Sequence, residues 1–266
     1  MTHFFASLSF DWSVTSVADN VGRRLHESGL KPHWDLGGCC EIEEIIFICF
    51  YAAYVVAFFV LYHTTILKPM RLLSVFVHEF GHASACFMTG GSVKKIEVYE
   101  NEGGVTGYTG GCRTLVIPAG YVGGAFWGGV FVALSGSKIG STIVASLISF
   151  ALLISLCLKP NTMVVALSLG FSSLLIGFIF IEWFVFDPLL EFITLFFGVF
   201  IGMYSVRDIY DDLITRTAEG SDAVACNKLY PCCLPRCVGV QFWMVAFAFQ
   251  VAGIYCALVW MVTEHN

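Results

Sequence analysis

The sequence predicts an all-α integral membrane protein, a polytopic bundle of six or seven transmembrane helices with a small glycine-rich β-hairpin or re-entrant segment after the second helix. Composition is the first observation, because 57% of the 266 residues are hydrophobic and only 13% are charged. So few polar side chains cannot cover the surface of a soluble domain of this length. The second observation is a series of apolar runs, several of them about 20 residues long, the length that crosses roughly 30 Å of hydrocarbon.

Seven of these apolar runs are predicted to cross the membrane. They cover residues 45–67, 72–88, 115–134, 141–158, 162–183, 189–206 and 240–262. The second run is short, but a basic start at Lys68 and a glycine pair at Gly90 support a real helix. Pro188 separates the fifth run from the sixth, because proline disfavours helical geometry in the residue before it.

These runs define the predicted domain organisation. A single membrane domain covers residues 44–262, with its functional core at 72–222. A cytosolic segment, 1–43, precedes it, and a short tail, 263–266, follows it. The sequence has no basic patch of the kind that binds nucleic acid. The expected surrounding of the apolar runs is the lipid bilayer.

The distribution of lysine and arginine predicts an orientation. If all seven runs cross the membrane, one side carries eleven of these residues and the other side carries three. The three are Lys68, Arg71 and Lys138. By the positive-inside rule the N-terminus is then cytosolic, and the C-terminus is outside or lumenal.

A metal-binding motif lies inside the second apolar run, at His78-Glu79-Phe80-Gly81-His82. Two histidines four residues apart lie on one face of a helix, so both imidazoles can bind one Zn²⁺ while Glu79 activates a water molecule. Ionisable side chains are costly within a bilayer, and three in one turn indicate a functional site.

The predicted metal site needs a third protein ligand, because catalytic zinc usually has three ligands and one open position for water. The second and sixth runs are predicted to end on the same side, which makes Asp208 the first choice. Asp211 and Asp212 could replace Asp208 or orient it. Asp222 is a further alternative, in a loop that is less constrained.

The polar segment after the second run predicts a hairpin. Residues 93–99 alternate in the manner of a strand, Gly103 and Gly104 suit a turn, and 105–109 can return as a second strand. Such a segment can form one wall of a water-containing cavity and offer a strand edge to an unwound substrate. Its acidic residues Glu97, Glu100 and Glu102 could reach the metal but are interpreted as solvated. An ordinary polar connector is the alternative for the whole segment.

Together these features resemble the site-2 protease type of intramembrane zinc metallopeptidase. The resemblance rests on the histidine motif within an apolar run, the glycine-rich insert at 102–111 and a late run bearing an aspartate. The stretch 118–128 and the triplet Ser221-Asp222-Ala223 are similar to a compact branch of these enzymes. The resemblance covers residues 72–222 and implies hydrolysis of a peptide bond in a membrane-anchored protein substrate. Better-known members have their third ligand in an Asp-Gly pair, whereas Ile209 follows Asp208 here.

The expected chemistry follows from these residue types. His78, His82 and Asp208 are predicted to hold zinc, which lowers the pKa of a bound water toward about 7. Glu79 then accepts the proton and returns it to the leaving amine. A non-catalytic relative that binds membrane proteins or serves in quality control is the alternative function. A channel or transporter is a third, although the sequence has no detectable repeat.

Two further patterns are interpreted as structural. Gly120, Gly124 and Gly128 form a stripe of small residues that permits close helix packing. A cysteine cluster lies in a loop assigned to the cytosol, where disulfides are disfavoured and the spacing lacks a strong zinc pattern. Reduced or lipidated cysteines are therefore expected at Cys226, Cys232, Cys233 and Cys237.

Overall fold

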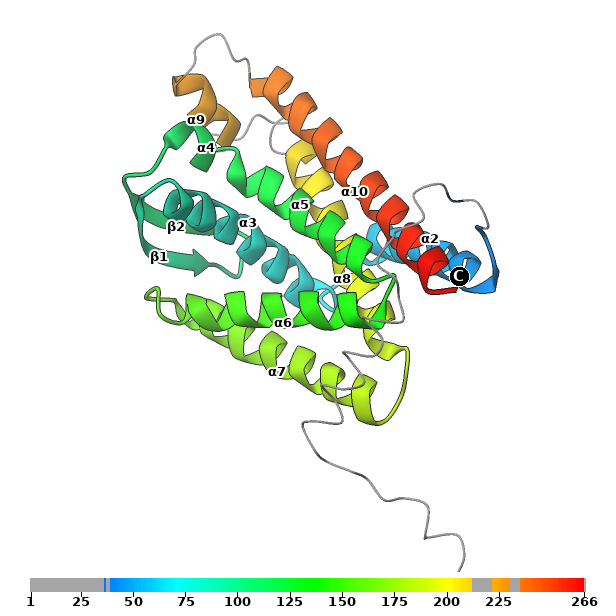
Figure 1. The fold of residues 1–266 in the computed structure, drawn as a ribbon. Coiled ribbons are helices and arrows are strands. Elements are labelled where there is room, and N and C mark those ends of the chain that lie inside the picture. The colour runs from blue at the N-terminus through cyan, green and yellow to red at the C-terminus, as the bar shows by residue number, and fades with distance from the viewer. Residues whose placement is uncertain (1–35, 37–38, 212–221, 230–234, 266) are drawn as a thin grey trace, which may run out of the picture.

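The computed structural model describes residues 36, 39–211, 222–229 and 235–265, which are mostly helical with one small sheet. The helices before the sheet are α2 (Ile42–Leu61) and α3 (Lys68–Met88), and the strands are β1 (Ser92–Val98) and β2 (Gly104–Thr109). The remaining helices are α4 (Arg113–Val116), α5 (Ala119–Leu134), α6 (Lys138–Ser155), α7 (Thr162–Phe184), α8 (Leu189–Ile209), α9 (Asp222–Leu229) and α10 (Pro235–His265). Figure 1 shows α6 and α7 as a pair on one side of the bundle and the hairpin beside α3.

Each of the seven predicted apolar runs contains a helix, but the described part of the chain has five helices that are long and apolar enough to cross a membrane. These five are α2, α6, α7, α8 and residues 236–261 of α10. Helix α5 has only 16 residues, and α3 carries the polar motif. Five such helices fit a multi-pass membrane protein, while the predicted count of seven spans is not confirmed.

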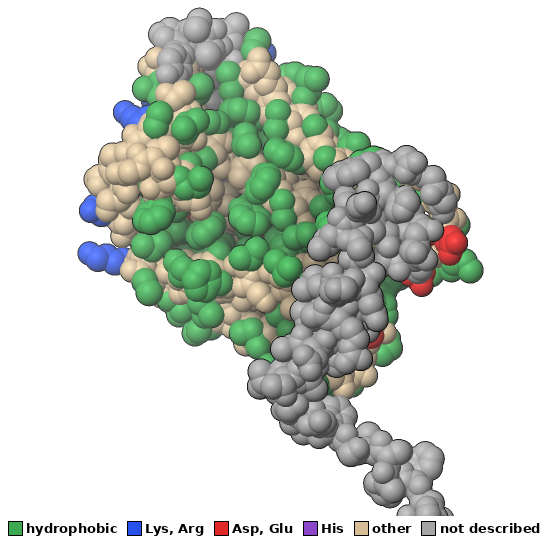
Figure 2. Space-filling model, in the orientation of Figure 1, with side chains coloured by type: hydrophobic (Ala, Val, Ile, Leu, Met, Phe, Trp, Pro, Cys, Tyr) green, Lys and Arg blue, Asp and Glu red, His purple; other side chains and the backbone are tan. Residues whose placement is uncertain are grey.

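Helix α8 lies at the centre of the bundle. Of its most apolar stretch, 72% is buried against other elements, compared with 17% for α2. Glycines allow this close packing, since a Cβ at Gly128 of α5 would overlap the backbone of Gly202 in α8. The predicted role of the glycine stripe in helix packing is confirmed at Gly128. On the outside, Figure 2 shows hydrophobic side chains over much of the visible face.

The direction of α2 differs from the prediction. Its aromatic rings contact α8 with a constant offset of 142 residues, which shows that the two helices run parallel. The pairs are Phe50 with Phe192, Tyr54 with Phe196, Phe58 with Phe200, and Tyr62 with Tyr204. The predicted alternation of spans makes the first and sixth antiparallel, so that alternation does not hold.

Helix α3 explains the difference, because it runs in the same sense as α2 rather than crossing back. Gly81 of α3 lies against Ala119, near the start of α5, whereas Val77 of α3 and Phe131 of α5 line one small cavity farther along both helices. Helix α3 is therefore antiparallel to α5, which is antiparallel to α8. In consequence the start of α2 and the end of α10 lie at the same end of the bundle, where Phe47 and Met261 line one cavity.

The predicted hairpin is confirmed. Strands β1 and β2 pair antiparallel from Ser92 opposite Thr109 to Val98 opposite Gly104. Ile96 and Val98 are fully buried and belong to the main hydrophobic core, which also contains residues of α3. The hairpin thus packs one face on the helix that carries the motif, and Figure 1 shows this arrangement.

Candidate metal centre

Helix α3 presents the two motif histidines on one face. The helix has Pro69 in its first turn and ends before Gly90, whose φ of +79° suits a residue without a side chain. Within it, the Nε2 atoms of His78 and His82 lie 3.2 Å apart. The spacing of four residues therefore directs both imidazoles to one point, as the sequence predicts.

The backbone orients one of these rings. Nδ1 of His82 lies 2.7 Å from the carbonyl oxygen of Val116 in α4. Because a carbonyl oxygen can only accept, Nδ1 carries the proton and donates a hydrogen bond to that oxygen. This contact leaves the Nε2 lone pair of His82 available to a metal, and partners of this kind set the tautomer of histidines that bind metals.

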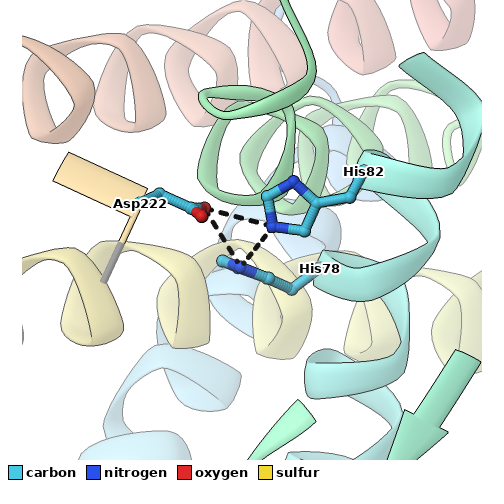
Figure 3. A group of neighbouring side chains, drawn as sticks. All are labelled: His78, His82 and Asp222. Carbon is cyan, nitrogen blue, oxygen red and sulfur yellow. Dashed lines mark hydrogen bonds and ion pairs between the residues drawn. The ribbon is translucent and has the colours of Figure 1, made fainter. Parts of the chain in front are cut away.

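The third group at this point is Asp222, the first residue of α9. Its Oδ2 lies 3.4 Å from Nε2 of His78 and 3.2 Å from Nε2 of His82, and Figure 3 shows the three side chains converging. The same oxygen is buried. A tetrahedral zinc ion with bonds of about 2.0–2.1 Å holds its ligand atoms roughly 3.3 Å apart. The two nitrogens and the carboxylate oxygen therefore fit zinc in both chemistry and spacing.

The Asp222 carboxylate is ionised in this position. Burial alone would raise its pKa, but the facing imidazoles of His78 and His82 outweigh that effect and lower the pKa to about 2. A carboxylate must be deprotonated to bind a metal ion, so Asp222 has the required charge at neutral pH.

The other aspartates considered from the sequence do not join this group within the described residues. Oδ2 of Asp208 lies 4.0 Å from Nδ1 of His78, on the edge of the ring that faces away from Asp222. That distance is too long for a hydrogen bond, but it is the side from which carboxylates orient ligating histidines. Asp211 pairs with Arg207, with 3.3 Å between Oδ2 and Nε. Asp212 lies outside the described residues.

Glu79 lies beside the metal group and is held by the hairpin. The hydroxyl of Thr106 donates to Oε2 of Glu79 at 2.6 Å and also lies 2.9 Å from the Glu79 carbonyl oxygen. A Cβ at Gly104 would overlap the same carboxylate. Strand β2 therefore covers Glu79 directly, and this close contact requires glycine at position 104. The sequence did not predict this role for Gly104 or for Thr106.

A cavity of about 420 Å³ opens beside these residues. Its walls include the motif residues, Asp208, Asp222, the hairpin from Glu102 to Thr106, and the rings of Tyr121 and Tyr204. The predicted polar wall is therefore present, and open space lies beside Glu79.

Gly120 contributes to the site rather than to helix packing. A Cβ at this position would overlap Nε2 of both His78 and His82. Its membership of the glycine stripe concealed this role, because the spacing of Gly120, Gly124 and Gly128 suggests packing alone.

Comparison with known proteins places this site in a family. The family model described as Peptidase M50B-like matches residues 51–258, a range that contains both histidines, Glu79, Asp208 and Asp222. Neither the curated proteins nor the solved structures give a match.

Proposed function

Because the chain belongs to the Peptidase M50B-like family, we propose that it is an intramembrane zinc metalloendopeptidase that hydrolyses peptide bonds of membrane-anchored proteins. One observation carries the proposal. Two histidine nitrogens and a buried carboxylate oxygen converge beside Glu79 in a cavity, which is the donor set and acid–base group that hydrolytic zinc sites use.

In this proposal His78, His82 and Asp222 hold the metal. Asp208, the first choice from the sequence, instead orients His78, and its position at the Nδ1 edge of that ring supports this role. When bound, zinc polarises the scissile carbonyl and lowers the pKa of a bound water toward about 7.

The protein's own groups perform the proton transfers. Glu79 accepts a proton from the attacking water and donates it to the leaving amine. Thr106 donates to Oε2 and so fixes the carboxylate during both transfers. The hairpin excludes lipid from this side, and its backbone is tolerated at membrane depth because it is packed against protein.

The relative directions of the helices change the proposed orientation. Of the fourteen lysines and arginines, eight belong to segments joined to the metal-site end of the bundle, and four belong to segments joined to the opposite end. The other two, Lys68 and Arg71, lie in α3. Figure 2 shows the same asymmetry on one face, with basic side chains beside the hairpin and acidic ones opposite. By the positive-inside rule the metal site then faces the cytosol, and the start of α2 faces the other side.

Metal content tests the ligand set. Purified wild type is expected to hold one zinc per chain, and His78→Ala, His82→Ala and Asp222→Ala should lose it. Asp208→Ala should keep the stoichiometry but bind about 10–100-fold more weakly, the usual cost of removing an orienting group. Loss of zinc in Asp208→Ala with retention in Asp222→Ala would restore Asp208 as the ligand.

Cleavage tests the activity itself. New protein termini can be compared in membranes from cells that express wild type or Glu79→Gln at equal levels. Glu79→Gln should keep zinc and lose the new termini, since only the proton acceptor is removed. Identical termini in both samples would contradict the proposal, and full complementation by Glu79→Gln would favour the non-catalytic alternative.

A further inference from the structure

Three carboxylates gather at the end of the bundle opposite the metal centre. They belong to Glu182 near the end of α7, Asp187 in the turn, and Glu191 near the start of α8. One oxygen of each lies within 4.8 Å of the others. Glu191 precedes Asp208 by 17 residues along α8, so this cluster lies about 25 Å from the metal centre.

Glu182 is the buried member, with only 2% of its surface exposed. Its Oε2 accepts a hydrogen bond from the backbone N–H of Leu190 at 2.7 Å, which caps α8. Its Oε1 is buried and has no hydrogen-bond partner. Burying a carboxylate oxygen without a partner costs several kcal/mol of desolvation, so this atom indicates a missing ligand.

The charge of the cluster indicates the sign of that ligand. Lys138 donates to Oδ2 of Asp187 at 2.6 Å and to the carbonyl oxygen of Glu182 at 3.2 Å. Three acidic side chains and the buried oxygen of Glu182 suit a cation.

The donors and the space around them indicate which cation. All three groups offer oxygen, with no thiolate or imidazole among them, and such sites favour Ca²⁺ or Mg²⁺ over zinc. A cavity of about 530 Å³, lined by Asp187 and Glu191, gives room for bound water. Calcium takes six to eight oxygens in flexible geometry, which suits ligands from a turn and two helices better than the strict octahedron of magnesium does.

We propose that Glu182, Asp187 and Glu191 bind a calcium ion that joins the end of α7 to the start of α8. The bound ion supplies the partner that Oε1 of Glu182 lacks. It is independent of hydrolysis and of the zinc site, and its expected effect is on the stability of the α7–α8 turn.

Terbium is a suitable probe, because it binds oxygen sites of this kind and is excited through a nearby indole. Trp183 provides that indole, since its ring centroid lies 5.1 Å from Nζ of Lys138. Purified full-length protein should give sensitised terbium emission, and calcium should suppress it at lower concentration than magnesium. His78→Ala should emit as wild type does, and Trp183→Phe should lose the emission.

Substitutions then locate the ion. Glu182→Gln and Glu191→Gln should each weaken terbium binding by about tenfold or more, because ligand charge sets affinity at such sites. Glutamine at 182 keeps an oxygen for the Leu190 N–H, so the fold should be preserved. Glu100→Gln, which changes an exposed acid in the hairpin turn, is the matched control.

Thermal unfolding gives a second readout, since calcium should raise the melting temperature of wild type and of Trp183→Phe but not of Glu182→Gln. Absence of sensitised emission in wild type overturns the proposal. So does emission that is unchanged in both Glu182→Gln and Glu191→Gln.

Discussion

Arg71 of α3 forms an ion pair with Glu102 at the tip of the hairpin, with 2.7 Å between Nε and Oε1. The guanidinium is buried and also donates to the carbonyl oxygens of Tyr62 and Thr64 in the turn after α2. One side chain thus joins three chain segments at the rim of the cavity beside the candidate metal centre, which Glu102 lines. Glu102 is therefore partly solvated, as expected, but it is also held in an ion pair.

Glu102→Gln should loosen the hairpin tip. The substitution leaves Arg71 buried without its counter-charge, and the partial exposure of Glu102 limits the expected cost to about 1–2 kcal/mol. Hydrogen exchange of the amides near Gly103 should accelerate. Glu97→Gln is the matched control, because Glu97 pairs with Lys95 on the exposed face of the same hairpin. Equal exchange in the two variants would show that Arg71 does not hold the tip.

Gly120→Ala should prevent tight zinc binding. Its Cβ would overlap Nε2 of both His78 and His82, so the affinity should fall by at least about 10–100-fold. Competition with a chromophoric chelator measures this change. Gly124→Ala serves as control, since its Cβ would make only ordinary contacts of 3.5 and 3.6 Å with Ser205. Wild-type affinity in Gly120→Ala would mean that α5 lies farther from the histidines.

Thr106→Val should slow cleavage without removing zinc. A hydrogen bond to a charged group contributes about 1.5–3 kcal/mol, so loss of the bond to Glu79 should lower kcat/KM by roughly 10–100-fold. The rate can be measured on any substrate found by the comparison of termini. Thr106→Ser keeps the hydroxyl and should restore most of the activity. If serine and valine slow cleavage equally, the hydroxyl does not act on Glu79.

Gly202→Ala should destabilise the bundle. Its Cβ would overlap the side-chain amide of Gln250, a buried group whose Oε1 accepts a hydrogen bond from the Tyr51 hydroxyl at 3.1 Å. Overpacking of this kind costs about 1–3 kcal/mol, measurable by thermal unfolding in detergent. Gly177→Ala in α7 has open space for its Cβ and should unfold at or above the wild-type temperature. Equal stability of both variants would argue against tight packing around α8.

Local patterns predicted much of this molecule. The helices, the hairpin and the convergence of His78 and His82 follow from periodicity and spacing, which act over a few residues. The prediction of Asp208 as the third ligand rested instead on its depth in the membrane. That depth was inferred by assuming that every apolar run crosses the membrane in turn. Helices α2 and α3 run the same way, and α9 brings Asp222 back over the histidines, so depth alone could not rank the aspartates.

The role of Gly120 could not be predicted for a related reason. A glycine in a stripe of small residues can pack against another helix or lie beside a functional site. Which of the two occurs at Gly120 depends on how α3 crosses α5, because that crossing decides which side chains face the glycine. The triplet containing Asp222 was the one sequence signal for its position, and it came from family resemblance rather than from geometry.

The position of Asp222 also bears on how the protein is made. It follows His82 by 140 residues, with α5, α6, α7 and α8 between them. A ribosome must therefore synthesise most of the bundle before the proposed metal ligands can meet. Until then the nascent chain has its two histidines but lacks the carboxylate, so the proposed metal site forms only after the intervening helices have been made.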